Sequence, residues 1–284
     1  MSFSQLRPLS IGEVLDGAFT IYRRQFASMF LTALVPQIPM IALLTLYYGV
    51  LGSLAGAGAA GSEPSMAALF AMGVGAVILV PAAVIGNATA VGAITFQTAR
   101  AYTGAPVTTR EAIRRGLDRA LPLVGAYMVV GFLAFLGFFA LIVGMFVVLL
   151  GAFAVAPAVV LERRGPVEAM SRSWALVKGA WGEVFLVAVL AYLIAMLPGM
   201  AVGMVTTIGG LLLSHGDPSL IMASQAVGQV LSQVARTLTI PFSLGATVLL
   251  YYDRRVRTEA LDVQMMAESL AAAPRVETPA PSWG

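Results

Sequence analysis

The stretch ALPLVGAYMVVGFLAFLGFFALIVGMFVVLLGAFAVAPAVVL, from Ala120 to Leu161, runs for 42 residues without a charged side chain. A helix needs about 20 apolar residues to cross the roughly 30 Å hydrocarbon core of a bilayer. The stretch is therefore long enough for two membrane spans with almost no loop between them. Gly137 and Gly144 bracket the expected turn.

The rest of the chain has the same apolar character. Hydrophobic residues make up 59% of the sequence and charged residues 11%, and the mean hydropathy of +0.88 exceeds that of soluble globular domains. Charge-free windows predict six spans, at about 27–54, 66–98, 120–139, 142–161, 184–213 and 219–252. The expected fold class is all-α, a polytopic membrane helix bundle that forms a single integral membrane domain over residues 1–270. Residues 271–284, rich in Ala, Pro and Ser, are expected to be a disordered cytoplasmic tail.

The basic residues lie on one side of these spans. Every one of the 17 lysines and arginines except Arg236 precedes span one, follows span six, or lies between spans two and three or four and five. The loops on the other side, around Gly56–Ser65, Gly137–Gly144 and Ser214–Pro218, contain none. Because Lys and Arg are retained on the cytoplasmic side, we expect a multi-pass protein of the inner or plasma membrane with both termini in the cytoplasm. The first apolar run is too long for the core of a cleavable signal peptide.

Three segments on the basic side have the pattern of amphipathic helices. They lie at about 10–26, 109–119 and 166–181. In the third, the apolar stripe consists of Val167, Met170, Trp174, Val177 and Trp181. Each segment has a glutamate near its start, Glu13, Glu111 or Glu168, and each precedes two spans. This order favours three repeats of one surface helix and one transmembrane hairpin, the alternative being that any interfacial helix converges on such a pattern.

These three helices are expected to lie in the headgroup layer and to form a basic collar on the cytoplasmic face. Indole rings prefer the interface, so Trp174 and Trp181 are predicted to anchor the collar. The residues predicted to bind anionic lipid headgroups are Arg114, Arg115, Arg119, Arg163, Arg164 and Arg172. The same charge asymmetry explains the isoelectric point near 9.4, so nucleic acid is not expected as a partner.

Three motifs stand out: PLSIGEVLDGAFTIYRRQF from Pro8, PAVVLERRGPVEAMSRSWALVKG from Pro157, and TVLLYYDRRVRTEALDVQ from Thr247. Together they resemble the bacterial and archaeal family called the glycerophosphoryl diester phosphodiesterase membrane domain. The resemblance covers about Pro8 to Gln264 and implies a six-span membrane protein from a family of mostly unassigned function. Ala260 departs from it, because the family's closing motif would have glycine there.

The enzymatic part of that family name is not expected to apply. A glycerophosphodiester phosphodiesterase needs a soluble barrel with paired histidines and metal-binding carboxylates, whereas His215 is the single histidine and the chain has no cysteine. The cluster of His215 and Asp217 reads as a turn, because two ligands without further partners hold a metal poorly. No metal site, cofactor or catalytic residue is predicted.

Span six contains a polar face. Its members, spaced so that they project from one side of a helix, are Gln225, Gln229, Gln233 and Arg236. One interpretation is a polar path or anion-binding groove in the outer half of the bundle. The other, which we favour, places this part of the helix at the outer interface, with Arg236 reaching towards the headgroups.

The expected function is that of a non-enzymatic scaffold, accessory or lipid-organising membrane protein, which binds anionic lipids at its collar. The alternative is a transporter or channel for a small or lipid-like anion that uses the polar face of span six. The sequence identifies no protein partner and leaves a homo-oligomer open.

Overall fold

A computed structural model describes residues 7–59, 61, 65–139 and 142–260. All regular structure in this part of the chain is helical. Six helical segments are long and apolar enough to cross a membrane: Phe26–Leu54, Met66–Tyr102, Ala120–Phe139, Val143–Val160, Trp181–Leu213 and Leu220–Glu259. The predicted all-α bundle with six spans is confirmed, although the second and sixth helices run several residues further than the charge-free windows. The predicted tail, 271–284, lies outside the described residues.

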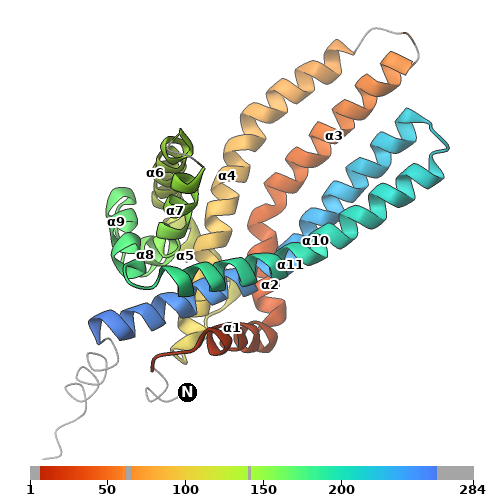
Figure 1. Ribbon diagram of the computed structural model, residues 1–284. Helices are drawn as coiled ribbons and strands as arrows, with labels where there is room; N and C mark the ends of the chain where they lie inside the picture. The colour runs from red at the N-terminus through yellow and green to blue at the C-terminus, as the bar shows by residue number, and fades with distance from the viewer. Residues whose placement is uncertain (1–6, 60, 62–64, 140–141, 261–284) are drawn as a thin grey trace, which may run out of the picture.

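The helices can be divided into three consecutive units along the chain (Figure 1). The first unit contains α1 (Ile11–Arg24), α2 (Phe26–Leu34), η2 (Val35–Gln37), α3 (Ile38–Ala59) and α4 (Met66–Tyr102). The second contains α5 (Thr109–Asp118), α6 (Ala120–Phe139), α7 (Val143–Gly151) and α8 (Val155–Val160). The third contains α9 (Pro166–Val177), α10 (Trp181–Leu213) and α11 (Pro218–Glu259). Each unit thus begins with a short polar-faced helix and continues into a hairpin, in the order predicted from the sequence.

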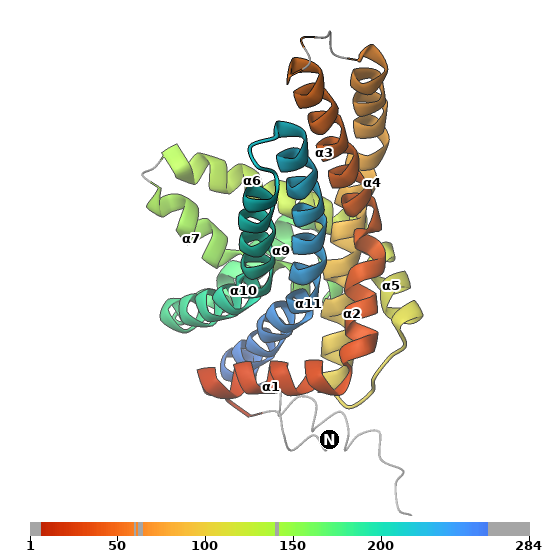
Figure 2. The same ribbon diagram turned by 90° about the vertical axis from the view of Figure 1, so that its right-hand side faces the viewer.

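The basic residues gather away from the hairpin tips. In Figure 1 the tips of the α3–α4 and α10–α11 hairpins point to the upper right, while α1 and the end of α11 lie at the lower side. Figure 2 shows α1 lying across the lower end of the bundle and α5 beside α2 and α4. The uncharged loops at these two hairpin tips therefore lie at the opposite side of the bundle from α1 and the end of α11, which carry basic residues.

Each of the three short helices has a glutamate in its first turn, Glu13, Glu111 or Glu168. The side chain of Glu13 accepts a hydrogen bond from the backbone N–H of Ser10 at 2.8 Å, which completes a capping box. Glu168 accepts the N–H of Gly165 at 3.4 Å in the same way. In α5, the Thr108 hydroxyl instead accepts the N–H of Glu111 at 3.3 Å. Local capping accounts for where each short helix starts.

The apolar faces of these helices pack on protein. Val14 and Ala18 of α1 are buried in a cluster with Leu249 of α11, and Val177 of α9 belongs to the same cluster. Ala169 and Met170 of α9 are buried against residues of α6 and α8. Part of the predicted stripe is thus buried against neighbouring helices, whereas Val167 of α9 is 69% exposed. That the three helices are amphipathic surface helices stays a prediction.

The predicted third amphipathic helix, 166–181, is too long. Helix α9 ends at Val177, and Gly179 adopts a left-handed backbone with φ +84°. Glycine tolerates this conformation and ends helices with it. Trp181 therefore opens α10 and belongs to the fifth span, which begins three residues earlier than predicted.

Close contact of backbones holds the hairpin of α6 and α7 together. A Cβ atom on Gly137 would lie 2.7 Å from the carbonyl carbon of Gly144. The two glycines that bracket the predicted turn are thus the points at which the two helices approach each other, as small residues do in membrane helix pairs.

Candidate functional site

One hollow in the described part of the chain lies where several spans end. Its volume is about 740 Å³, and it is enclosed by the last turns of α4, by α5, by the end of α8 and by α11. The residues that line it are Phe96, Ala99, Arg100, Thr103, Ala105, Arg115, Asp118, Arg119, Val160, Leu161, Arg163 and Tyr252. We call this hollow the arginine pocket.

Positive charge dominates the arginine pocket. Four arginines line it, Arg100, Arg115, Arg119 and Arg163, against one acidic residue, Asp118. Within the described residues, none of the four arginines forms an ion pair. A cluster of like charges without counter-charges is unfavourable unless solvent or an anion compensates it. The arrangement is therefore suited to an anionic ligand.

Aromatic rings support the pocket wall. The guanidinium carbon of Arg115 lies 5.8 Å from the ring centroid of Phe96, a cation–π contact that holds the charge in place. Tyr252 lines the pocket as well, and its ring lies 5.4 Å from that of Tyr102. These rings give the pocket an apolar side next to its charged one.

The position of α5 depends on a close approach to α4. A side chain at Gly116 would place its Cβ 2.6 Å from the backbone nitrogen of Ala93 and 2.9 Å from the Cβ of Ala93. Only glycine lets the two backbones come this near. The contact brings Arg115, next to Gly116, and Arg119, which caps the C-terminal end of α5, to the end of α4 that carries Arg100.

The segment that follows α8, from Leu161 to Arg164, contains a sharp turn. Arg163 has a left-handed backbone with φ +57°, which is unusual for a residue other than glycine. Leu161 and Arg163 line the arginine pocket, whereas Glu162 and Arg164 form an ion pair with each other. Because of the strained turn at Arg163, adjacent side chains point to different places: one lines the pocket and the next binds Glu162. Backbone strain of this kind is common at functional sites.

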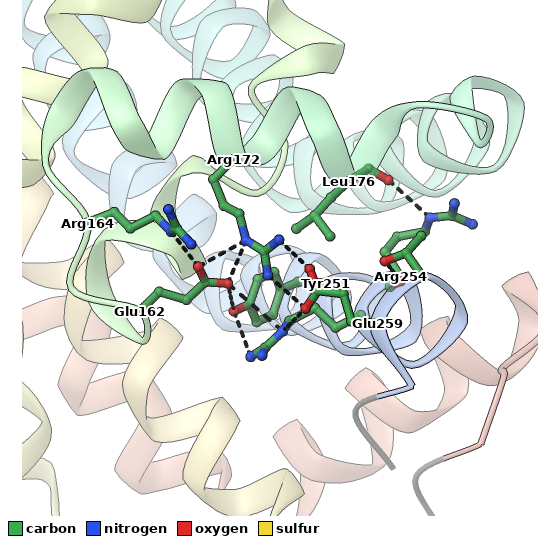
Figure 3. A network of polar contacts seen from close by, with 9 residues as sticks. Glu162, Arg164, Arg172, Leu176, Tyr251, Arg254 and Glu259 are labelled. Atoms are coloured by element: carbon green, nitrogen blue, oxygen red, sulfur yellow. Dashed lines mark hydrogen bonds and ion pairs between the residues drawn. The ribbon is translucent and has the colours of Figure 1, made fainter. Parts of the chain in front are cut away.

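Glu162 is the centre of an ion network next to the pocket (Figure 3). Its carboxylate accepts hydrogen bonds from Nε of Arg164 at 2.6 Å, from Nε of Arg172 at 2.9 Å and from the hydroxyl of Tyr251 at 2.7 Å. The far end of the Arg172 guanidinium donates to both oxygens of Glu259, with Nη2 at 2.9 Å from Oε2. The network joins the segment after α8, helix α9 and the end of α11.

Proton affinities in the network follow from these contacts. Burial raises the pKa of Glu162, but the hydrogen bonds from Tyr251, Arg164 and Arg172 outweigh it and hold that pKa below its ordinary value. The hydrogen bonds with Glu259, opposed by burial and aided by Glu162, raise the pKa of the Arg172 guanidinium above its already high value. Both groups therefore stay charged at neutral pH.

The C-terminal end of α11 also forms hydrogen bonds with the chain before α1 and with α9. Asp253 accepts the backbone N–H of Leu9 at 2.7 Å and the guanidinium of Arg257 at 2.9 Å. Nε of Arg254 donates to the carbonyl of Leu176, near the end of α9, at 3.2 Å. The last turns of α11 thus contact the chain before α1 as well as α9.

The structure divides the six predicted headgroup-binding arginines. Arg115, Arg119 and Arg163 come together in the arginine pocket. Arg114 is exposed and does not line it, and Arg164 and Arg172 bind Glu162 instead. Sequence reasoning missed Arg100 and Tyr252 as pocket residues and Glu162 and Tyr251 as the core of the network. The signal was present, because Glu162 and Tyr251 lie in two of the motifs that carry the family resemblance.

The predicted tryptophan anchors lie beside each other. The rings of Trp174 and Trp181 are 5.3 Å apart and nearly perpendicular. Trp174 is 40% exposed and packs over Gly151 of α7, where a Cβ would collide with its ring. Their role as interfacial anchors stays a prediction.

The polar face of span six lies on α11, away from the arginine pocket. Gln225, Gln229 and Gln233 are half-buried and Arg236 is exposed. The Arg236 side chain packs across Gly199 of α10, where a Cβ would lie 2.8 Å from its Nε. Both interpretations of this face, a polar path and an outer-interface contact, stay open.

His215 lies in the connection between α10 and α11, and no group of three or more metal-ligating residues occurs in the described part of the chain.

Replacing Arg163 by glycine is expected to change folding and anion binding in opposite directions. Glycine removes the left-handed strain, which costs a non-glycine residue roughly 1 kcal/mol, so thermal stability in detergent should stay equal or rise. The pocket loses one of its four arginines, so binding of an anionic ligand, for which anionic lipid is the probe, should fall. Thermal unfolding and lipid copurification on the same sample measure the two effects. A variant that is clearly less stable would contradict the strain assigned to Arg163.

Comparison with known protein families matches residues 10–254 to a family described as a domain of unknown function (DUF7847). No curated protein and no solved structure matches the chain. The resemblance to the glycerophosphoryl diester phosphodiesterase membrane domain therefore stays a prediction.

Proposed function

The chain belongs to the family described as a domain of unknown function (DUF7847), and we propose from its own geometry that it is a non-enzymatic membrane protein that binds anionic lipid headgroups. The observation that carries the proposal is the arginine pocket, with four arginines that form no ion pair among the described residues. A scaffold, accessory or lipid-organising role fits a multi-pass bundle with such a site.

The depth of the pocket along the bundle supports a headgroup as the ligand. Arg100 lies in the last turn of a helix that is apolar enough to span, and Arg119 comes directly before the next such helix. Val160 is the last residue of a third. Lipid headgroups lie at the level where apolar helices end, so the pocket is open to the phosphate layer of the bilayer.

The charge distribution also supports an orientation. The pocket is lined by residues at the ends of α4, α5 and α8, away from the loops that join the two helices of each hairpin, and basic residues are retained in the cytoplasm. We propose that the protein lies in the inner or plasma membrane with both termini in the cytoplasm, and that the pocket faces the cytoplasmic leaflet. Anionic lipids of this leaflet attract nearby Lys and Arg by about 1 kcal/mol each.

The test is a double substitution of Arg115 and Arg119 by glutamine. At about 1 kcal/mol per charge near the surface, the apparent affinity for anionic lipid is expected to fall at least tenfold. Lipid that copurifies in mild detergent is measured by mass spectrometry. The matched control replaces Arg23 and Arg24, two exposed arginines of α1 outside the pocket, by glutamine.

Equal losses of lipid from both double variants would assign binding to general surface charge and remove the pocket from the proposal. An Arg236→Gln variant tests the transporter alternative. If that change alone abolishes the cellular phenotype while the pocket variants keep it, the polar face of span six carries the function instead.

A further inference from the structure

We infer that the arginine pocket selects lipids whose headgroup ends in a terminal phosphate, a phosphomonoester or a diphosphate, over lipids in which the phosphate is a diester. This inference rests on the proposed function and names the ligand class of the same site. It is carried by the balance of charge in the pocket, the shape of the guanidinium groups and the apolar wall beside them.

The charge of the pocket exceeds that of a phosphodiester. Arg100, Arg115, Arg119 and Arg163 supply four positive charges and Asp118 one negative charge, a surplus of three. A phosphodiester carries one negative charge and leaves most of this surplus unbalanced. A terminal phosphate carries about 1.5 to 2 negative charges at neutral pH, and a diphosphate adds the charge of its bridging phosphate. These two more highly charged classes therefore match the surplus of the pocket more closely.

The number of acceptor oxygens leads to the same class. A guanidinium group presents a planar fork of donors that binds two oxygens at once. A phosphodiester offers two oxygens that are not esterified, and a single fork already engages both. A terminal phosphate offers three, so it accepts bonds from more than one arginine. Arg115 is held over Phe96 in advance, which lowers the entropic cost of binding.

The ligand is inferred to be a lipid and not a free anion because of the pocket wall. Phe96, Ala99, Val160 and Leu161 line it beside the arginines. These residues belong to the ends of two apolar helices, α4 and α8, or follow directly after them. A volume of about 740 Å³ lies in the range of pockets that hold whole small molecules, so a headgroup fits together with the start of its chains.

The experiment compares phosphatidic acid with phosphatidylglycerol. The purified full chain is placed in nanodiscs that contain either lipid at equal mole fraction in a neutral background, and bound lipid is counted by native mass spectrometry. Phosphatidic acid is expected to bind at least fivefold more tightly at about pH 8. Its advantage should shrink as the pH falls through about 6, where the second phosphate ionisation is lost, because the arginines keep their charge.

Each result supports or overturns a separate statement. Equal binding of the two lipids at all pH values overturns the terminal-phosphate inference and leaves the proposed function standing. Binding of neither lipid overturns both. If inorganic pyrophosphate alone binds as tightly as phosphatidic acid, the assignment of a lipid is wrong.

Two variants separate the pocket from general charge. Arg100→Gln with Arg163→Gln is expected to abolish the preference for phosphatidic acid, whereas Arg23→Gln with Arg24→Gln should keep it. A preference that survives in the pocket variant overturns the inference. Thermal unfolding of both double variants checks that each is folded. Arg163→Gly is a second pocket variant, which also relieves the left-handed backbone strain at that position.

Discussion

Replacing Glu162 by alanine is expected to lower the free energy of unfolding by about 1.5–3 kcal/mol, the usual contribution of hydrogen bonds to a charged group. The Glu162 and Arg172 side chains are only 12% and 15% exposed. Without the carboxylate, Arg164 and the hydroxyl of Tyr251 lose their acceptor, and Arg172 keeps only Glu259. Thermal or denaturant unfolding in detergent measures the effect.

The matched control is Asp16→Ala. Asp16 is an exposed carboxylate of α1 that takes part in no ion pair among the described residues. Its replacement should change stability by less than about 0.5 kcal/mol. A second control replaces both Glu162 and Arg172 by methionine, which should recover part of the loss because no buried charge is left alone. If Glu162→Ala and Asp16→Ala prove equally stable, the network has no structural role.

The pH dependence provides an independent readout of Glu162. Its folded pKa lies below the ordinary value of 4.5, so the unfolded chain takes up its proton first as the pH falls. Its contribution to stability is therefore complete above about pH 4.5 and disappears as the pH falls through the folded pKa. The Glu162→Gln variant lacks this group and should lose stability less steeply below about pH 4.5 than the natural protein.

Replacing Gly116 by alanine is expected to destabilise the protein by about 1–3 kcal/mol, the usual cost of overpacking. The new Cβ would collide with backbone and with the Cβ of Ala93, neither of which is the end of a flexible side chain. Helix α5 must move away from α4, and Arg115 and Arg119 move with it. Anionic lipid binding should therefore fall although no charge is changed. Unfolding and lipid copurification measure the two losses.

The same substitution at Gly131 is the control. Gly131 lies within α6, and nothing comes within 4 Å of a Cβ built on it. Alanine there should stabilise the helix by roughly 0.5–1 kcal/mol, because glycine loses more conformational freedom on folding. Opposite signs at the two glycines are the expected result. A Gly116→Ala protein that is as stable as the natural one and binds lipid normally would show that the α4–α5 contact does not position the pocket.

The positions of the spans could be predicted from the sequence because they depend on local composition. A charge-free window long enough to cross a bilayer forms a helix wherever it occurs in the chain, and the windows ended within a few residues of the helices. The starts of the short helices were also predictable. Glu13 and Glu168 bind backbone groups only three residues away, so the signal lies within one turn.

The end of the third short helix was mispredicted because the apolar stripe continues through it. Trp181 keeps the helical spacing of Trp174, so periodicity alone joins them. The break depends on Gly179, whose left-handed backbone redirects the chain into α10. Whether the apolar residues of a short helix contact lipid or protein also depends on the tertiary structure, since the sequence pattern of an amphipathic helix is the same in both cases.

The sequence by itself determined that the described part of the chain forms six helical segments long and apolar enough to cross a membrane. It also determined the order of short helices and hairpins and the separation of basic from uncharged connections, because each follows from composition within a window. Only the tertiary structure decided which arginines are available to a ligand. Arg163 and Arg164 are identical and adjacent, yet one lines the pocket and the other binds Glu162. That difference depends on a left-handed turn and on Tyr251, 89 residues away from Glu162 along the chain, and contacts over such distances leave no periodic signal in the sequence.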